Sequence, residues 1–150
     1  MIKALLLSLG MLFPEVVFNI QFADIKKLSF NTPQGLTYDI YTNQSPKTPP
    51  KKVIMLLHGL AKDGKDDVLL VGLAKAFVRV GYSVFVPDID GLKHSQVCLD
   101  EVNEVRMHLV EMCKIFKDTK TKGVMSFCYS NSPLIAALST GRELEVGGGK

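Results

Sequence analysis

Gly123-Val-Met-Ser-Phe-Cys-Tyr-Ser-Asn131 is the stretch that decides the predicted fold. It sets Cys128 between a short apolar run and a helix-like segment, with Ser126 and Ser130 two positions to either side. A sharp strand-to-helix turn needs small neighbours of this kind, because strand and helix then approach closely. Such a turn exposes the cysteine at the edge of a sheet and aims the Tyr129 N–H at a reacting carbonyl. The spacing alone is a weak signal, since a cysteine beside a strand is more often a small buried hydrophobe.

A second informative segment comes earlier, where the apolar run Val53-Ile-Met-Leu-Leu57 leads directly into His58 and Gly59. The run does not alternate with polar residues, which indicates a parallel strand buried on both faces. Gly59 lets the backbone turn back over the sheet, so that the N–H of Leu60 or Ala61 becomes a second oxyanion donor. His58 is interpreted as a residue that hydrogen-bonds the loop, in preference to one that accepts a proton.

Strands and helices alternate along the rest of the chain. Two strand-like segments, 27–30 and 36–41, flank a run of turn residues, which predicts an antiparallel hairpin at a sheet edge. Apolar residues recur at helical spacing in two further segments, and short apolar runs separate these helices. The predicted helices span about 67–80, 100–116 and 132–138, and the predicted strands 53–57, 83–86 and 122–126. The fold class predicted is therefore α/β: an N-terminal antiparallel hairpin leading into a parallel sheet with flanking helices.

In this order the elements resemble the α/β-hydrolase superfamily, and within it the dienelactone-hydrolase-like branch. The matching segments are 53–59, 66–67 with 73–76, 81–88, 91–92 and the turn at Cys128. The resemblance covers roughly residues 27–140. It implies hydrolysis of carboxylic esters, lactones or related acyl compounds, with a small-molecule acyl substrate and neither a metal nor an organic cofactor.

The resemblance also implies roles for individual residues. Cys128 matches the nucleophile, and Tyr129 and Leu60 match the positions whose N–H groups form the oxyanion hole. The remaining site positions shape the two loops and are expected to be structural: His58, Gly59, Ser126 and Ser130.

Two parts of the family's catalytic triad have no match. In the family the acid and the histidine follow the nucleophile in chain order. The 22 residues after Cys128 contain two glutamates and no histidine, whereas His58, His94 and His108 all precede it. The strand before His94 is expected to be separated from the turn strand by the strand that ends at His58, which disfavours His94 as a replacement base. We therefore expect an incomplete α/β-hydrolase domain over residues 24–150, truncated before the triad acid and histidine and inactive alone.

The N-terminus leaves two alternatives open. Lys3 precedes the apolar run Ala4–Phe13, which has the length of a signal-peptide core and is too short to span a bilayer. No clear small-residue cleavage site follows, so an apolar segment packed on the sheet is an equal alternative for residues 1–23. Export to the periplasm or medium follows from the first interpretation and a cytoplasmic location from the second. No transmembrane span is predicted.

Composition narrows the function classes further. The net charge of +3 comes from scattered lysines, which argues against nucleic-acid binding. Three cysteines without metal-ligand spacing disfavour a zinc site and exclude a full disulfide framework. Two rival interpretations stay open: a non-catalytic α/β binding module, and an unstable product of a truncated gene. If no strand follows 122–126, that strand stays at the sheet edge, which predicts self-association.

Overall fold

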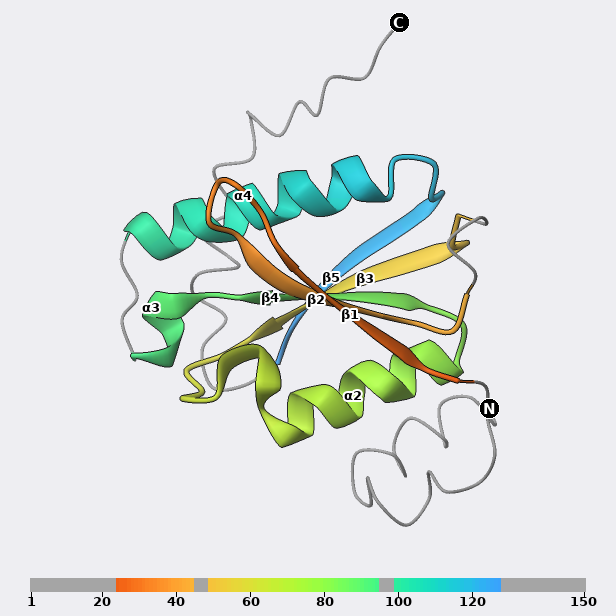
Figure 1. The fold of residues 1–150 in the computed structure, drawn as a ribbon, viewed down its shortest axis with the longest axis horizontal. Helices are drawn as coiled ribbons and strands as arrows, with labels where there is room; N and C mark the ends of the chain where they lie inside the picture. Colours follow the sequence, from red (N-terminus) through yellow and green to blue (C-terminus); the bar gives the residue numbers. More distant parts are fainter. Residues whose placement is uncertain (1–23, 45–48, 95–98, 128–150) are drawn as a thin grey trace, which may run out of the picture.

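The computed structural model describes residues 24–44, 49–94 and 99–127. Five strands form one mixed sheet in the order β1-β2-β4-β3-β5, with helices on both faces (Figure 1). The strands are β1 (Lys26–Asn31), β2 (Thr37–Thr42), β3 (Lys52–His58), β4 (Ser83–Asp88) and β5 (Thr121–Phe127). The helices are η1 (Gly64–Asp66), α2 (Val68–Arg79), α3 (Asp90–Lys93) and α4 (Leu99–Ile115).

The predicted hairpin and the predicted parallel strands are both confirmed. β1 pairs antiparallel with β2, and β2 pairs antiparallel with β4. β4, β3 and β5 run parallel, with β3 in the middle. The turn between β1 and β2 closes at Gly35, whose φ of 83° lies in the left-handed region that glycine adopts without steric cost. The fold class is therefore the one that the strand and helix patterns predict.

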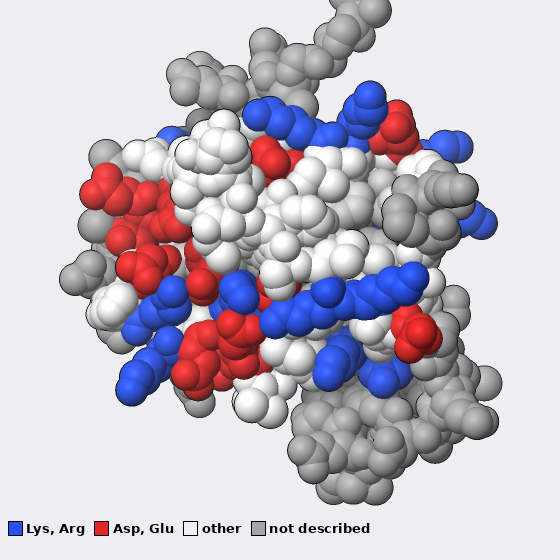
Figure 2. Space-filling view, viewed as in Figure 1, with Lys and Arg blue, Asp and Glu red and all other residues white. Residues whose placement is uncertain are grey.

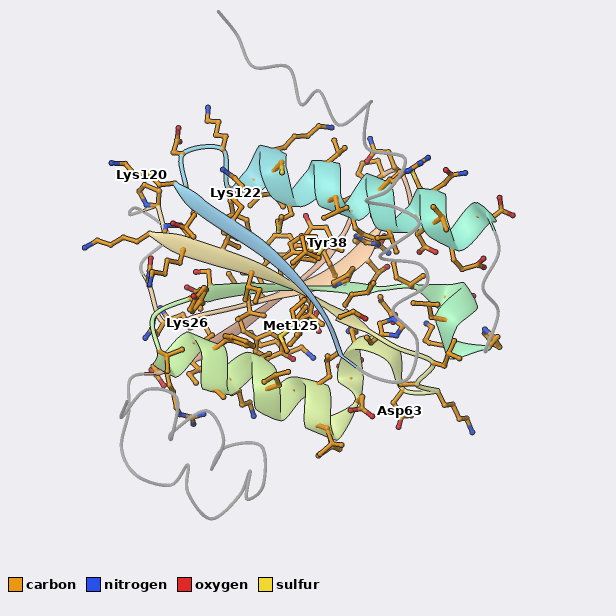
Figure 3. All side chains as sticks on the ribbon, turned by 180° about the vertical axis from the view of Figure 1, so that it is seen from behind. Lys26, Tyr38, Asp63, Lys120, Lys122 and Met125 are labelled. Carbon is orange, nitrogen blue, oxygen red and sulfur yellow. The ribbon has the colours of Figure 1, made fainter. Side chains whose placement is uncertain are left out.

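Each face of the sheet is covered by one long helix, α4 on one side and α2 on the other (Figure 1). Strand residues alternate between the two cores: Met55 packs on the α4 side, and Leu56 packs on the α2 side. Figure 3 shows the same division for Tyr38, which points toward α4, and Met125, which points toward α2. The unbroken apolar run in β3 follows from this burial on two faces.

The ends of α2 follow from local chemistry. The Asp67 side chain accepts hydrogen bonds from the N–H groups of Leu69 and Leu70, both at 3.0 Å, so it is the N-cap. Gly81, with φ of 95°, lies just beyond the helix end, where a left-handed residue stops the helix. No helix among the described residues is long and apolar enough to cross a membrane.

Three local features differ from the sequence-based prediction. The short helices η1 and α3 were not predicted, because four residues or fewer are too few to show a helical period. β4 continues to Asp88, although a proline at position 87 suggested an end at Val86. Pairing of β4 with β3 stops at Phe85, so the missing N–H of Pro87 removes no hydrogen bond to β3, and β2 pairs with the last residues.

Candidate active site at the carboxyl edge of the parallel strands

Three parallel strands end at the same edge of the sheet, at His58, Asp88 and Phe127. His58 and Phe127 are direct neighbours in the pairing of β3 with β5. The segment that contains Cys128, Tyr129 and Ser130 begins immediately after β5 and lies outside the described residues. The loops after β3 and β4 are described, and they form the described part of the candidate site.

His58 ties two of these loops together. Its ring is buried, with Nδ1 2.8 Å from the Gly59 carbonyl oxygen and Nε2 2.9 Å from the Ile89 backbone nitrogen. Since the Ile89 N–H must donate to Nε2, the proton of the neutral ring sits on Nδ1 and is donated to Gly59. Burial lowers the pKa of His58, against the smaller opposing effects of the Gly59 bond and of Asp88. Both ring nitrogens are thus engaged with the backbone.

Two backbone N–H groups after His58 are the candidate oxyanion donors, those of Leu60 and Ala61. The Ala61 N–H donates to the Gly59 carbonyl at 2.8 Å, so it is not free for a ligand. The N–H of Leu60 has no acceptor among the residues that the structure describes, and its side chain is 39% exposed. Of the two donors that the sequence suggested, the geometry favours Leu60.

Asp88, at the end of β4, holds the far end of the same loop. Its Oδ2 lies 3.1 Å from Lys93 Nζ, and its Oδ1 accepts a 3.4 Å hydrogen bond from the Lys65 N–H. Gly64 has a φ of 54°, and a Cβ there would collide with the Asp88 carboxylate and the Lys93 side chain. The loop therefore needs a glycine at this position for both backbone and packing reasons.

A cluster of ion pairs around Asp39 anchors the loop after β3 to β2. The Asp39 side chain is fully buried, and its Oδ2 lies 3.1 Å from Lys65 Nζ and 3.0 Å from Lys27 Nζ. Asp66 also contacts both lysines. Burial acts to lower the pKa of Lys65, but hydrogen bonds to Asp66 and Asp39 outweigh it and raise the pKa. The loop is thus fixed on one side by Asp88 and on the other by Asp39.

Sequence reasoning missed this cluster, although one signal was present. Asp39 stands between Tyr38 and Ile40 in a strand whose residues are otherwise apolar or half-buried. A carboxylate in such a strand requires a cationic partner. Which lysine supplies it depends on the tertiary fold, because Lys65 is far from Asp39 in sequence.

The other two histidines belong to other elements than β3 and β5. His94 follows α3, its side chain is two-thirds exposed, and its Nδ1 is 3.0 Å from the backbone oxygen of Asp90. β3 separates β4 from β5, as expected, which places the His94 loop away from the β5 end.

His108 lies on α4 and is fully buried, with edge-on contacts to the rings of Tyr38 and Phe85. Neither ring nitrogen has a hydrogen-bond partner among the described residues. Burial lowers the pKa of His108 to about 4. Its place in the apolar stripe, between Val105 and Leu109, is the signal that would have predicted this burial.

Two further site residues can be placed in part. Gly59 is buried at the end of β3, beside the strand end of β5. Ser126 pairs with Leu57 in the β3–β5 ladder, and its Oγ is buried without a partner among the described residues. Within the described part of the chain, no group of three or more His, Cys, Asp or Glu residues is placed to hold a metal ion.

Comparison with known proteins gives matches in structure and none in sequence. No protein-family model matches the chain, and no curated protein matches it either. The esterase Pf2001 of Pyrococcus furiosus superposes with a TM-score of 0.55 at 17% identity, covering 81% of this chain and 46% of the esterase. A dienelactone hydrolase from Anabaena variabilis gives 0.54 at 11% identity, covering 79% of this chain and 58% of that protein.

A third match, XC6422 from Xanthomonas campestris, is described as an α/β serine hydrolase without a lid. It gives a TM-score of 0.52 at 16% identity, with 80% of this chain and 58% of that chain covered. The present chain spans about half the length of these structures. The described residues therefore form part of the α/β-hydrolase fold, as the order of motifs in the sequence implied.

Proposed function

We propose that this chain supplies the nucleophile and the oxyanion loop of an acyl hydrolase that acts on carboxylic esters, lactones or related small acyl compounds. In this proposal the Cys128 thiolate attacks the acyl carbonyl, and the Leu60 and Tyr129 N–H groups stabilise the resulting oxyanion. Collapse of the tetrahedral intermediate expels the alcohol and leaves a thioester on Cys128. Water then attacks the thioester, releases the acid and restores the thiol.

The observation that carries the proposal is the Leu60 N–H, which has no acceptor among the described residues and follows β3, the strand next to β5. His58 at the end of β3 pairs with Phe127 at the end of β5. Leu60 comes two residues after His58, and Cys128 comes one residue after Phe127. Adjacent strands are about 4.8 Å apart, a distance that one carbonyl group can bridge. The hydrogen bonds of His58 and Lys65 hold the loop that carries Leu60, which favours a preformed donor.

The base is a separate part of the proposal. Both nitrogens of His58 are engaged with the backbone, and His94 lies on an exposed turn beyond the neighbouring strand. No histidine follows Cys128 in the sequence. We infer that the 150 residues do not turn over an ester by themselves, because a thiol without a base is mostly protonated at neutral pH.

Self-association through β5 belongs to the same proposal. Among the described residues β5 pairs only with β3, and a strand without a partner on its outer side can pair with another chain. We expect the chain to elute above its monomer mass of 16.5 kDa in size-exclusion chromatography. A soluble monomer with one sharp thermal transition would contradict this part and leave the acyl-transfer part standing.

The hydrolytic proposal is tested with p-nitrophenyl acetate and added imidazole as an external base. We expect stoichiometric acetylation of Cys128 by intact-mass analysis, and slow turnover only when imidazole is present. The background in Cys128→Ala is subtracted, because imidazole itself cleaves the ester. Cys113→Ala, which removes the partly buried thiol of α4, is the matched control and should acetylate normally. Acetylation that persists in Cys128→Ala would overturn the proposal.

A further inference from the structure

The opposite edge of the sheet contains a cavity of about 560 Å³ that the proposed hydrolysis does not use. The strand register places Lys26, Thr42 and Ser83 in one row at this amino edge, where β1 and β4 begin and β2 ends. The end of α4 closes the cavity from one side, since Ile115 and Phe116 line it. A volume of this size is typical of small-molecule sites.

The walls of this cavity are mainly apolar. Leu28, Ile40, Ile115 and Phe116 line it together with Pro49 and Pro50. Leu28 and Ile115 are 41% and 40% exposed, so apolar surface faces solvent here. The hydroxyl groups of Thr42 and Ser83 satisfy each other at 2.9 Å and do not need a ligand. The interior thus suits a hydrocarbon chain.

Lysines gather at this edge of the sheet. Lys26 lines the cavity, three more lysines each stand next to a lining residue in the sequence (Lys51, Lys117 and Lys120), and Lys52 begins β3 at the same edge. None of these five ammonium groups forms an ion pair with a carboxylate of the described chain, and Asp118 is the acidic residue in the lining.

The charges separate along the sheet. Figure 3 shows Lys26, Lys120 and Lys122 at one end and Asp63 at the other. In Figure 2 the acidic side chains gather mainly at the end of the sheet opposite this cavity.

We propose that this cavity binds a single-chain amphiphile with an anionic head, of the class of a free medium-chain fatty acid. The hydrocarbon chain lies against Leu28, Ile40 and Ile115, and the carboxylate lies at the rim beside Lys26. Lys26 and Asp118 are the charged residues of the lining, and the further lysines at this end of the sheet leave an excess of positive charge that complements an anionic head group. This inference does not depend on the proposed hydrolysis, because it uses the other edge of the sheet.

Calorimetric titration of the 150-residue chain with dodecanoate, below its micelle concentration, tests the site. We expect one binding event, weakened about tenfold or more by Lys26→Glu, which turns attraction into repulsion at the head group. Ile115→Gln should weaken binding, because it replaces part of the apolar wall with a polar amide. Lys62→Glu makes the same charge change in the loop at the opposite edge and should leave the affinity unchanged, as should Cys128→Ala. Dodecanol, which lacks the charge, should bind about tenfold more weakly.

Several outcomes would overturn the inference. They are absence of dodecanoate binding, equal losses in Lys26→Glu and Lys62→Glu, or binding only to vesicles of anionic phospholipid and not to the free acid. Loss of dodecanoate binding in Cys128→Ala would assign the ligand to the carboxyl edge of the sheet and would also contradict a binding site in the cavity at the amino edge. If Lys26→Glu does not melt cooperatively, Lys26→Gln is used in its place. An affinity of Lys26→Gln for dodecanoate equal to that of the parent chain would contradict the role of the lysine charge.

Discussion

The two ends of the sheet differ in what their lysines do. At the carboxyl edge, Lys65 pairs with Asp39 on β2 and holds the loop after β3, and Lys93 pairs with Asp88 and holds α3 to the end of β4. At the amino edge, Lys26 lines a cavity and makes no ion pair among the described residues. The same residue type therefore serves structure at one end and is available to a ligand at the other. The comparison predicts large effects on stability at the carboxyl edge and small ones at the amino edge.

The largest effect is expected at Asp39. Asp39→Asn removes the buried charge that Lys65 and Lys27 share, and breaking a buried ion pair of this kind costs about 3 kcal/mol of unfolding free energy. Asp66→Asn is the matched control, because Asp66 contacts the same lysines but is more than half exposed. It should cost less than about 1 kcal/mol. Urea unfolding of both variants measures the difference, and equal losses would contradict the structural role of the buried partner.

The second effect is a loss of stability in acid, caused by His108. Its pKa is about 4 in the folded chain and near 6.5 when unfolded, so between these values the unfolded chain binds a proton that the folded chain excludes. Stability should therefore fall as pH drops from 6.5 toward 4, by up to about 3 kcal/mol. His108→Leu should flatten this part of the pH profile. A profile that is as steep in His108→Leu as in the parent would assign the effect elsewhere, with buried His58 the next candidate.

The third effect compares two glycines with positive φ. Gly64→Ala should cost about 2 kcal/mol, because it adds a Cβ in the left-handed region against Asp88 and Lys93. Gly35→Ala carries the same kind of backbone strain but meets no atom within 4 Å, so it should cost only about 1 kcal/mol. Thermal denaturation of the two variants isolates the crowding at Asp88. A larger loss for Gly35→Ala would show that the loop after β3 has room to move.

The smallest effect is expected at the amino edge. Lys26→Gln should change the unfolding free energy by less than about 0.5 kcal/mol, since an exposed lysine without an ion pair contributes little. The measurement is again urea unfolding. A loss as large as that of Asp39→Asn would show that Lys26 is structural, and the contrast between the two ends would be lost.

Much of the fold could be predicted from local patterns. The apolar run of β3 indicated a strand buried on two faces. Asp66 or Asp67 indicated where α2 begins, of which Asp67 is the observed N-cap, and Gly81 indicated where it ends. These signals are local because they depend on the residue's own backbone or on neighbours in the sequence. The family resemblance then implied that β3 lies between β4 and β5, as is observed.

The remaining features depend on contacts between distant segments. Nothing in the sequence near Asp39 identifies Lys65 as its partner, and η1 and α3 are too short to show a period. At the candidate site, the pattern His58-Gly59 indicated a turn directly after β3. The folded loop alone reveals that the Ala61 N–H donates to Gly59, whereas the Leu60 N–H has no acceptor among the described residues.

The central claim is that the carboxyl edge carries an acyl-transfer nucleophile, and competitive labelling of the three cysteines with iodoacetamide under native conditions tests it most directly. The sequence predicts that Cys128 stands at a helix N-terminus, which favours its thiolate, whereas Cys113 is partly buried and packs against the core on α4. The account predicts that peptide mass spectrometry finds Cys128 alkylated first, ahead of Cys113 and Cys98. Alkylation of Cys113 at the same rate as Cys128, or faster, would contradict it.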